Sequence, residues 1–396
     1  MKIFVLGNIN SGKSYVVSKL KKIFPDYPVL AIDEYRINHS NGSIDSELKT
    51  RNLFANDILK HNNAIIEYSG GSMITNLFIN ELKINSFIII EVTEDVNVYL
   101  KRIQNKDFSK IPYPIFEESL EDTIIRLDKE FKNDSVKTNF KDKFLHRFKI
   151  SSIDDLSILP LKQYAEALKI SNHLQNGYKA IVLYGSLGRH KMNQNSDLDI
   201  FLYTDKSINA VYEDLLFIYP DSKFLFFKNQ IVIYYEDQLI ELSIISNLDD
   251  IQLYYVKSEI KNIKKTILLG YDQYHEQIEN IVENYKENLV VEFMYTMQRL
   301  EYFNLSLKRL IKKQDDYKYF FHTNIIIHEY IRLTYFMTGK REYGYLPVDA
   351  LNYISHDVFQ KLIYNVGDDK FKHSKSVNSL VRQILEQASL YLITLK

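Results

Sequence analysis

The chain has 396 residues, which is long for a single domain and predicts two or three domains. It contains no cysteine, which excludes disulfides, thiolate metal sites and cysteine nucleophiles. Its 50 Lys and Arg residues nearly balance 51 Asp and Glu residues, to a net charge of −1. We therefore do not expect nucleic acid as a partner, because nucleic-acid binders usually carry a basic excess.

The apolar runs of the chain are all short. None approaches the ~18 residues that a membrane-spanning helix requires. The opening segment Met1–Gly7 is also too short for a signal peptide. These features predict a cytoplasmic protein without a membrane partner, and they leave a homodimer open.

Residues 1–150 alternate short apolar strands with helical segments. This pattern predicts an α/β domain with a parallel sheet and helices on both faces. The predicted helices are Ser14–Ile23 and Asp95–Gln104, and the predicted strands are Ile3–Leu6, Val29–Ile32, Ala64–Glu67 and Phe87–Val92. The charged segment 128–149 lacks strong strand signals, so we expect the domain boundary there.

A glycine-rich sequence follows the first predicted strand. Its spacing, Gly7-x4-Gly12-Lys13-Ser14, matches the phosphate-binding P-loop in full. Glycines in such a loop let backbone N–H groups face phosphates, and the following helix adds the positive end of its dipole. Lys13 is expected to reach the β- and γ-phosphates of ATP, and Ser14 to bind Mg²⁺. The predicted nucleotide-binding residues of this loop are Gly7, Asn10, Ser11, Gly12, Lys13 and Ser14.

Charged residues near the ends of the next strands lie where an acceptor would bind, and the small size of the domain favours a kinase over a motor or switch, while a simple ATPase stays open. Asp33 resembles the aspartate that activates an acceptor hydroxyl in small P-loop kinases, such as the polynucleotide kinase and zeta-toxin-like families. In that resemblance Arg36 positions the substrate, and Glu67 serves as a metal or substrate group. Arg102 and Lys106 resemble the lid cations that neutralise the transferred phosphoryl group.

A second domain is expected at residues 151–280, with the mixed strands and helices of an α+β fold. Leu161–Leu174 is predicted as a helix, and the predicted strands are Ala180–Tyr184, Leu198–Tyr203, Gln230–Tyr235 and Leu239–Ile245. Apolar and polar residues along the last of these suit a partly buried strand with one functional face.

Two short motifs in this domain point to a second nucleotide site. Gly185 and Ser186 form a turn after a strand, and such a turn offers backbone N–H groups and a hydroxyl to a triphosphate. Asp197 and Asp199 are two positions apart, so their carboxylates project from one face of a strand. With Glu241 from a neighbouring strand, they are predicted to bind one or two Mg²⁺ ions that polarise the α-phosphate of an NTP.

The sequence Tyr184-Gly185-Ser186-Leu187-Gly188-Arg189, followed by Ser196–Ile200, resembles the polymerase-β-type nucleotidyltransferases. Within that superfamily it is most similar to the kanamycin (aminoglycoside) nucleotidyltransferases. The resemblance runs from about Leu161 to the C-terminus and is weak after Asn280. Arg189 is a reasonable triphosphate contact. The chain has Asp at both metal positions, whereas members of that group can carry Glu at the second.

Residues 281–396 are predicted as a C-terminal helical bundle, because apolar residues recur there at helical spacing. One predicted helix, Tyr319–Thr338, is followed by Gly339 in a C-cap position. In kanamycin-nucleotidyltransferase relatives a helix-borne glutamate of this region acts as general base. The resemblance implies this role for Glu292, with Glu301 as the second candidate.

Together these motifs predict a bifunctional enzyme, with an ATP-dependent kinase in the first domain and a Mg²⁺-dependent nucleotidyltransferase in the second. The second activity would move a nucleoside monophosphate from ATP, or another NTP, to a hydroxyl or phosphate of a small polar acceptor, such as an aminoglycoside-like molecule. Two alternatives stay open: a nucleic-acid end-processing enzyme, and a defence or antitoxin-type nucleotidyltransferase that modifies a protein.

Overall fold

The structure is a computed structural model that describes residues 1–104, 111, 119–188, 194, 196–251, 260, 262–284, 289–338, 354–364 and 368–394. The chain divides into two compact units. The first comprises residues 1–248 and 262–279, and the second comprises residues 249–261 and 280–396. The predicted domain division at residues 150 and 280 stays a prediction. None of the helices described is both long and apolar enough to cross a membrane.

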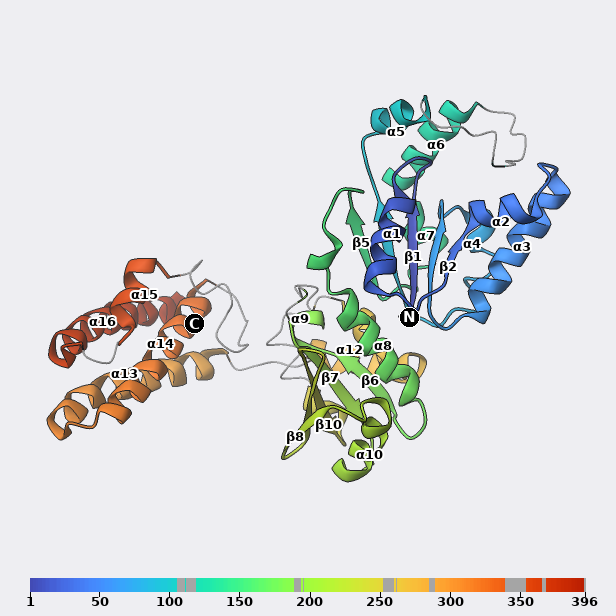
Figure 1. Ribbon diagram of the computed structural model, residues 1–396. Helices are drawn as coiled ribbons and strands as arrows, with labels where there is room; N and C mark the ends of the chain where they lie inside the picture. Colours follow the sequence, from blue (N-terminus) through green and yellow to red (C-terminus); the bar gives the residue numbers. More distant parts are fainter. Residues whose placement is uncertain are drawn as a thin grey trace. The chain divides into compact units, whose positions relative to one another are not determined.

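The first unit contains a five-stranded parallel sheet with the strand order β2-β3-β1-β4-β5 (Figure 1). Its strands are β1 (Lys2–Gly7), β2 (Val29–Ala31), β3 (Ala64–Tyr68), β4 (Phe87–Val92) and β5 (His146–Ile150). Parallel strands of this kind are buried on both faces, so they read as near-continuous apolar runs. The predicted α/β sheet is therefore confirmed for this part of the chain.

Helices cover both faces of this sheet. Along β1, Ile3 and Val5 pack in the same core as α1 (Lys13–Ile23), whereas Phe4 and Leu6 pack in the core of the opposite face. This alternation follows from the period of two along a strand. The helices on the second face include α3 (Ile44–Lys60), α4 (Ser72–Thr75) and α7 (Ser135–Asn139). The remaining helices of this part of the chain are α2 (Ile32–His39), α5 (Val96–Ile103) and α6 (Leu120–Lys132).

The edge strand β5 was not predicted from the sequence. Only Ile150 of its five residues is fully buried, so the strand lacks the apolar run that marks its neighbours. Its polar residues have a structural role, because Arg147 and Lys149 lie 3.6 and 3.8 Å from the buried carboxylate of Glu91. The predicted strand Val29–Ile32 is also one residue too long, since Ile32 begins α2.

The first unit also contains a six-stranded sheet with the order β11-β6-β7-β10-β9-β8. Strand β10 runs parallel to β7, and every other neighbouring pair is antiparallel. The strands are β6 (Ala180–Leu183), β7 (Leu198–Tyr203), β8 (Lys223–Phe227), β9 (Gln230–Tyr235), β10 (Gln238–Ile245) and β11 (Ile267–Leu269). The other elements between residues 151 and 284 are the helices α8 (Leu161–His173), α9 (Gly185–Gly188), α10 (Ile208–Ile218) and α12 (Tyr271–Asn284), and the 3-10 turns η1 (Leu156–Ile158), η2 (Leu248–Ile251) and η3 (Ile263–Thr266).

One hydrophobic core runs from the first sheet through α8 to the second sheet. Buried Val5 of β1, Leu168 of α8 and Leu242 of β10 all belong to it.

A buried lysine adds a polar connection within the same unit. Lys265 Nζ donates to the backbone carbonyls of Asp142 and Phe144, the latter at 2.7 Å, and lies 4.2 Å from the ring centroid of Phe144. Burial lowers the pKa of Lys265, and the Asp142 carboxylate, whose Oδ1 lies 2.9 Å from Nζ, opposes this effect.

A fully buried asparagine makes a second connection of this kind. Asn85 Nδ2 donates to the backbone oxygens of Lys264 at 2.6 Å and Ile267 at 2.8 Å. Asn85 lies in the turn before β4 of the first sheet, whereas its acceptors belong to η3 and β11. The two sheets are thus joined by directional hydrogen bonds as well as by apolar packing.

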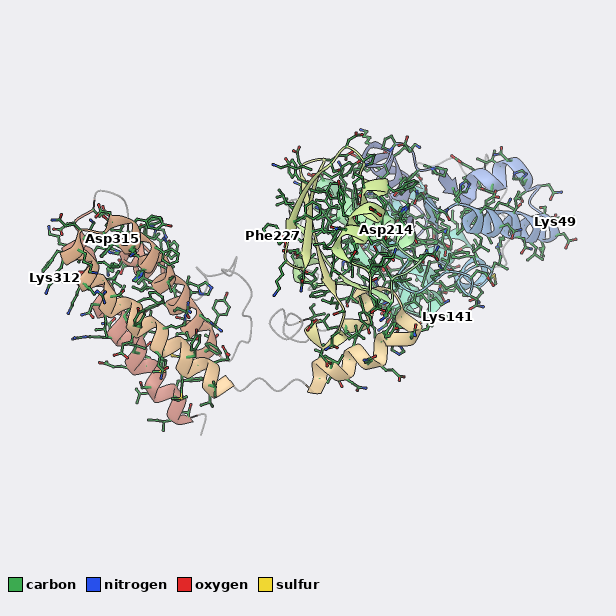
Figure 2. All side chains as sticks on the ribbon, turned by 90° about the horizontal axis from the view of Figure 1, so that it is seen from below. Lys49, Lys141, Asp214, Phe227, Lys312 and Asp315 are labelled. Atoms are coloured by element: carbon green, nitrogen blue, oxygen red, sulfur yellow. The ribbon has the colours of Figure 1, made fainter. Side chains whose placement is uncertain are left out.

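The second unit is a helical bundle made of α13 (Leu289–Lys313), α14 (Asp316–Met337), α15 (His356–Leu362) and α16 (Lys370–Thr394). Its core contains fully buried Leu300, Ile326 and Val381 from the three long helices. Lys312 and Asp315 mark the turn between α13 and α14 (Figure 2). The predicted C-terminal helices are confirmed, and the predicted cap Gly339 lies outside the described residues.

Lys265→Met is expected to lower the free energy of unfolding by about 2–4 kcal/mol, because it leaves buried carbonyl groups without a donor. Urea denaturation of the full chain measures this change. Lys264→Met is the matched control, because the Lys264 ammonium makes only a partly exposed ion pair with Glu279 at 3.3 Å. Its effect should stay within about 0.5 kcal/mol. Equal losses in the two variants would contradict the role of Lys265.

Candidate active site

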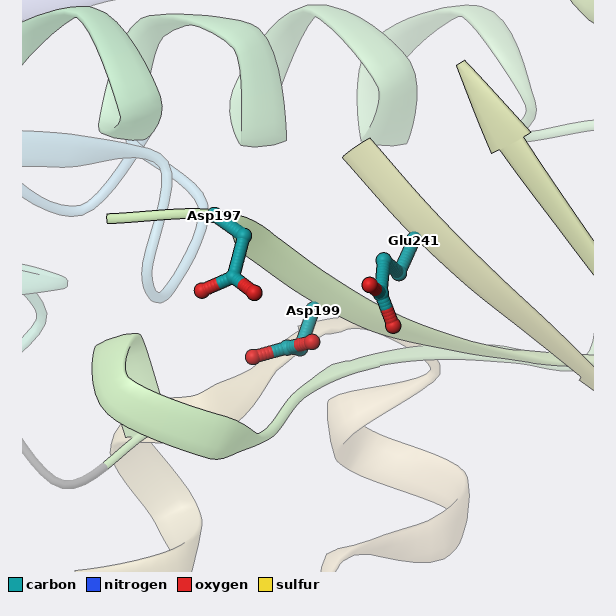
Figure 3. A group of neighbouring side chains, drawn as sticks. All are labelled: Asp197, Asp199 and Glu241. Atoms are coloured by element: carbon teal, nitrogen blue, oxygen red, sulfur yellow. The ribbon is translucent and has the colours of Figure 1, made fainter. Parts of the chain in front are cut away.

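Three carboxylates converge on one face of the six-stranded sheet (Figure 3). Asp197 immediately precedes β7, Asp199 is the second residue of β7, and Glu241 lies in β10. The parallel register places Glu241 directly opposite Asp199. Oxygen atoms of the three side chains all lie within 4.8 Å of one another. The structure thus brings together the residues that the sequence predicted as metal ligands.

Repulsion among these carboxylates makes the cluster suited to a cation. Burial, and then the negative charge of Asp197, raise the pKa of Glu241. Gln230 Nε2 opposes this effect by donating a hydrogen bond to Glu241 Oε2 at 2.9 Å. Carboxylate oxygens are the ligands that Mg²⁺ prefers in proteins. The donor set and its charge therefore fit a Mg²⁺ site.

The turn after β6 lies against this cluster. Gly185 has a φ of +60°, and a Cβ atom at this position would overlap the carboxylate of Asp199. Only glycine therefore lets the backbone approach Asp199 so closely. Ser186 Oγ is buried and has no hydrogen-bond partner among the described residues, which fits a hydroxyl that donates to a phosphate oxygen. Arg189, the predicted triphosphate contact, lies outside the described residues.

A second set of predicted residues lies where β1 leads into α1, in the segment 7–14 that we call the glycine loop. Gly12 has a φ of +95°, in the left-handed region that favours glycine. A Cβ atom there would lie 2.5 Å from the Cβ atom of Ser152, in the segment that follows β5. The loop therefore requires glycine at this position for both backbone and packing reasons.

Lys13 and Ser14 open helix α1 directly after the glycine loop. Lys13 Nζ donates to the backbone oxygens of Gly7 at 3.1 Å and Asn8 at 2.7 Å, so the ammonium group lies over the loop. Ser14 Oγ donates to Glu67 Oε1 at 2.7 Å. Ser14 and Glu67, which were predicted separately as groups of a Mg²⁺ site, are thus neighbours near the carboxyl ends of β1 and β3.

The middle of the glycine loop holds polar groups that fit a ligand. Asn10 Nδ2 and Ser11 Oγ are buried and have no hydrogen-bond partner among the described residues. Arg102, from α5, donates to the Asn10 backbone oxygen at 2.9 Å. The structure therefore brings this predicted cation to the loop, whereas Lys106 lies outside the described residues.

The predicted base of the first site belongs to an ion-pair network. Asp33, in the first turn of α2, accepts a hydrogen bond from Arg36 at 3.0 Å. Arg36 also pairs at 2.8 Å with the buried Glu47, which Arg51 approaches to 2.7 Å. Burial opposes ionisation of Glu47, but the two arginines outweigh it and lower the pKa of Glu47. Arg36 is thus held between Asp33 and Glu47.

Glu292 lies in the first turn of α13, in the second unit. Its carboxylate accepts a hydrogen bond from Arg332 at 3.0 Å. Arg332 and Arg299 also approach the buried Glu329, at 3.9 and 2.9 Å respectively. The predicted general base is therefore part of a charge network that links α13 to α14. Its catalytic role, like that of the second candidate Glu301, stays a prediction.

Gln230, the first residue of β9, was predicted to begin a strand, but its hydrogen bond to Glu241 was not predicted. Gln230 pairs with Ser243 and, by the alternation of side chains, lies on the same sheet face as Val232, the partner of Glu241. The β9–β10 hairpin sets this register. Its two-residue turn is Glu236-Asp237, and both residues have positive φ. Such turns usually carry Asn-Gly or Asp-Gly, so the sequence gives no clear signal for this one.

Glu241→Gln is expected to raise the Tm of the metal-free protein near neutral pH. The raised pKa means that ionisation of Glu241 costs the folded state stability. That cost is present above the folded pKa and vanishes below the unfolded value of about 4.3, so the difference in Tm should shrink as the pH falls toward about 4. Differential scanning calorimetry in a chelator measures it.

The control variant for this experiment is Glu213→Gln, on the exposed surface of α10. It should leave Tm almost unchanged at every pH, because its carboxylate lies outside the cluster. A rise in Tm that is equal in both variants, or that persists at low pH, would contradict the electrostatic account of Glu241.

Similarity to solved structures is low. A nucleotidyltransferase-like protein from Exiguobacterium sibiricum is 10% identical, with a TM-score of 0.32, covering 59% of this chain and 75% of that chain. An aminoglycoside 6-adenyltransferase from Bacillus subtilis is 12% identical, with a TM-score of 0.25, covering 59% and 91%. Shikimate kinase from Acinetobacter baumannii is 14% identical, with a TM-score of 0.29, covering 44% and 94%. At these TM-scores the likenesses carry no argument about this chain.

Comparison with curated proteins gives no match. The comparison with protein families is more specific. The range that matches a family model contains the whole carboxylate cluster and the turn at Gly185 and Ser186. Residues 163–288 match the family model described as "Nucleotidyltransferase domain".

Proposed function

We propose that the part of the chain with the carboxylate cluster transfers a nucleoside monophosphate from an NTP to an acceptor and releases pyrophosphate. One observation carries the proposal. Asp197, Asp199 and Glu241 converge beside the Gly185 turn, within the range that matches the nucleotidyltransferase domain. The family match supports the class of reaction, and the geometry supports the choice of residues.

In this reaction an acceptor oxygen attacks the α-phosphorus of the NTP. The bond from that phosphorus to the bridging oxygen breaks, pyrophosphate leaves with the oxygen, and the acceptor's proton passes to a base. Asp197, Asp199 and Glu241 would hold Mg²⁺, which polarises the α-phosphate and stabilises the leaving group. Ser186 and the backbone of its turn would orient the triphosphate. In our proposal Glu292 is the base.

A small polar molecule is the acceptor that we propose. The net charge of −1 supports it, because a nucleic-acid substrate would favour a basic surface. Binding of RNA or DNA that weakens with salt would instead favour an end-processing enzyme. Incorporation of α-label from ATP into a partner protein would favour the protein-modifying alternative.

For the five-stranded sheet we propose ATP-dependent phosphoryl transfer, as a separate activity of residues 1–150. The position of Lys13 over the glycine loop supports it, as does the contact between Ser14 and Glu67. Lys13 would bind the β- and γ-phosphates, and Ser14 with Glu67 would hold Mg²⁺. Asp33 would accept the proton of the acceptor hydroxyl, with Arg36 beside it orienting the acceptor.

A screen of small-molecule acceptors with ATP labelled at the α-phosphate tests the nucleotidyl transfer. We expect Asp197→Asn/Asp199→Asn to reduce label transfer and pyrophosphate release by about 100-fold or more, because the metal-binding charge is lost. Asp205→Asn is the matched control, since Asp205 lies just beyond β7 and its exposed carboxylate pairs with Lys179. Full transfer by the double variant would rule out this site as the catalytic centre.

ATP labelled at the γ-phosphate tests the phosphoryl transfer in the same screen. Lys13→Ala should reduce transfer of the γ-label by about 100-fold, because the cation at the phosphates is removed. Lys22→Ala, on the exposed side of the same helix, should retain it. A parallel loss of α-label transfer in Lys13→Ala would show that the two activities are not independent.

A further inference from the structure

The two aspartates of the cluster are held in different ways. Asp199 lies inside β7, opposite Glu241, and its backbone oxygen accepts a hydrogen bond from the Tyr184 N–H at 3.1 Å. Asp197 precedes Leu198, the first residue of β7, so the ladder of the sheet begins after it. The position of Asp197 therefore depends on what holds the segment in front of it.

A buried glutamine of α8 reaches that segment. Gln163 is 1% exposed, and its Nε2 donates to the backbone oxygens of Gln194 at 2.7 Å and Ser196 at 3.4 Å. A primary amide has two N–H donors, so one group can serve both carbonyls. These carbonyls belong to the main chain directly before Asp197. Gln163 thus ties this segment to α8.

Helix α8 is a rigid support for such a contact. Its residues Tyr164, Ala167 and Leu168 are each at most 3% exposed and belong to the core that joins the two sheets. Packing of this density leaves a buried side chain little freedom to move. The backbone of α8 therefore offers a fixed point from which Gln163 can position a neighbouring segment.

A cavity of about 550 Å³ borders the segment before Asp197, and Gln163, Gln194, Ser196 and Asp197 all contribute to the cavity wall. The hydrogen bonds of Gln163 hold the backbone of Gln194 and Ser196 beside this open space. Their loss would allow the segment, and the Asp197 carboxylate with it, to move toward the cavity.

We propose that Gln163 is a positioning residue for Asp197: its amide fixes the segment before Asp197 and so places that carboxylate for metal binding. This inference rests on the proposed nucleotidyl transfer. Gln163 acts through the main chain and does not contact the reacting groups. Mutation of groups that orient metal ligands in this indirect way typically weakens metal binding about 10- to 100-fold.

Mn²⁺ binding to the full-length protein, followed by electron paramagnetic resonance, tests this proposal without a need for activity. We expect Gln163→Leu to weaken Mn²⁺ binding by about 10-fold, because the backbone carbonyls lose their donors and Asp197 loses its fixed position. The Mg²⁺ concentration for half-maximal α-label transfer should rise by a similar factor. Transfer at saturating Mg²⁺ should largely recover.

Ser171→Ala is the matched control on the same helix. Ser171 is also buried, and its hydroxyl donates to the Leu268 backbone oxygen at 3.3 Å, a contact with β11 that involves none of the carboxylates. This variant should keep Mn²⁺ affinity and Mg²⁺ dependence at the wild-type level. An equal loss in Ser171→Ala would show that any loosening of α8 has the same effect, which would overturn the proposal.

Gln163→Met provides a second test if Gln163→Leu folds poorly. The methionine side chain has a similar length but neither a charge nor an N–H donor, so the same loss of Mn²⁺ affinity is expected. Unchanged Mn²⁺ affinity in a folded Gln163 variant overturns the positioning role. If the wild type binds Mn²⁺ but transfers no α-label to any acceptor, the nucleotidyl transfer fails, while the Mn²⁺ titration still decides the role of Gln163.

Discussion

The parallel register between β7 and β10 is the constraint on which the candidate active site depends. It places Glu241 opposite Asp199, although Glu241 lies in β10, which follows the β8–β9 hairpin in the chain. A slip of one residue would turn Glu241 to the other face of the sheet, because side chains alternate with a period of two. On the other side of β10, the antiparallel pairing with β9 fixes the position of β10 as well, and it places Gln230 within hydrogen-bond distance of Glu241.

Close backbone approach is the second requirement of this site. The turn at Gly185 lies so near Asp199 that a Cβ atom cannot be accommodated. The same principle recurs at Gly12, where the glycine loop meets Ser152. In both places glycine provides a left-handed backbone and the space for another group. The two candidate nucleotide sites therefore use the same local solution on two unrelated sheets.

The segment between the two sheets is closely bound to the first of them. Lys19 of α1 donates to the backbone oxygens of Ser152 at 3.3 Å and Asp154 at 2.8 Å. Helix α8 then continues the core toward the second sheet, and Lys265 and Asn85 add buried hydrogen bonds. These contacts explain why residues of both sheets fall within one compact unit.

Buried strands and local motifs were readable in the sequence. The apolar runs of β1 and β4 and the helix after the glycine loop were predicted because burial on both faces and helical spacing are local patterns. Strands β5, β8 and β11 were missed: β5 is mostly polar, β11 has only three residues, and β8 is an apolar run without the alternation that marks a half-buried strand. Their pairing partners lie on other strands, which no local pattern reveals.

The sequence by itself determined which residue types are available for phosphate and metal chemistry, because the spacings Gly7-x4-Gly12-Lys13-Ser14 and Asp197-x-Asp199 act within one turn or strand. Only the tertiary structure decided which distant groups join them. Glu67 reaches Ser14, and Gln163 reaches the segment before Asp197, through strand order and helix packing. These arrangements depend on contacts between elements far apart in the chain, so local spacing carries no information about them.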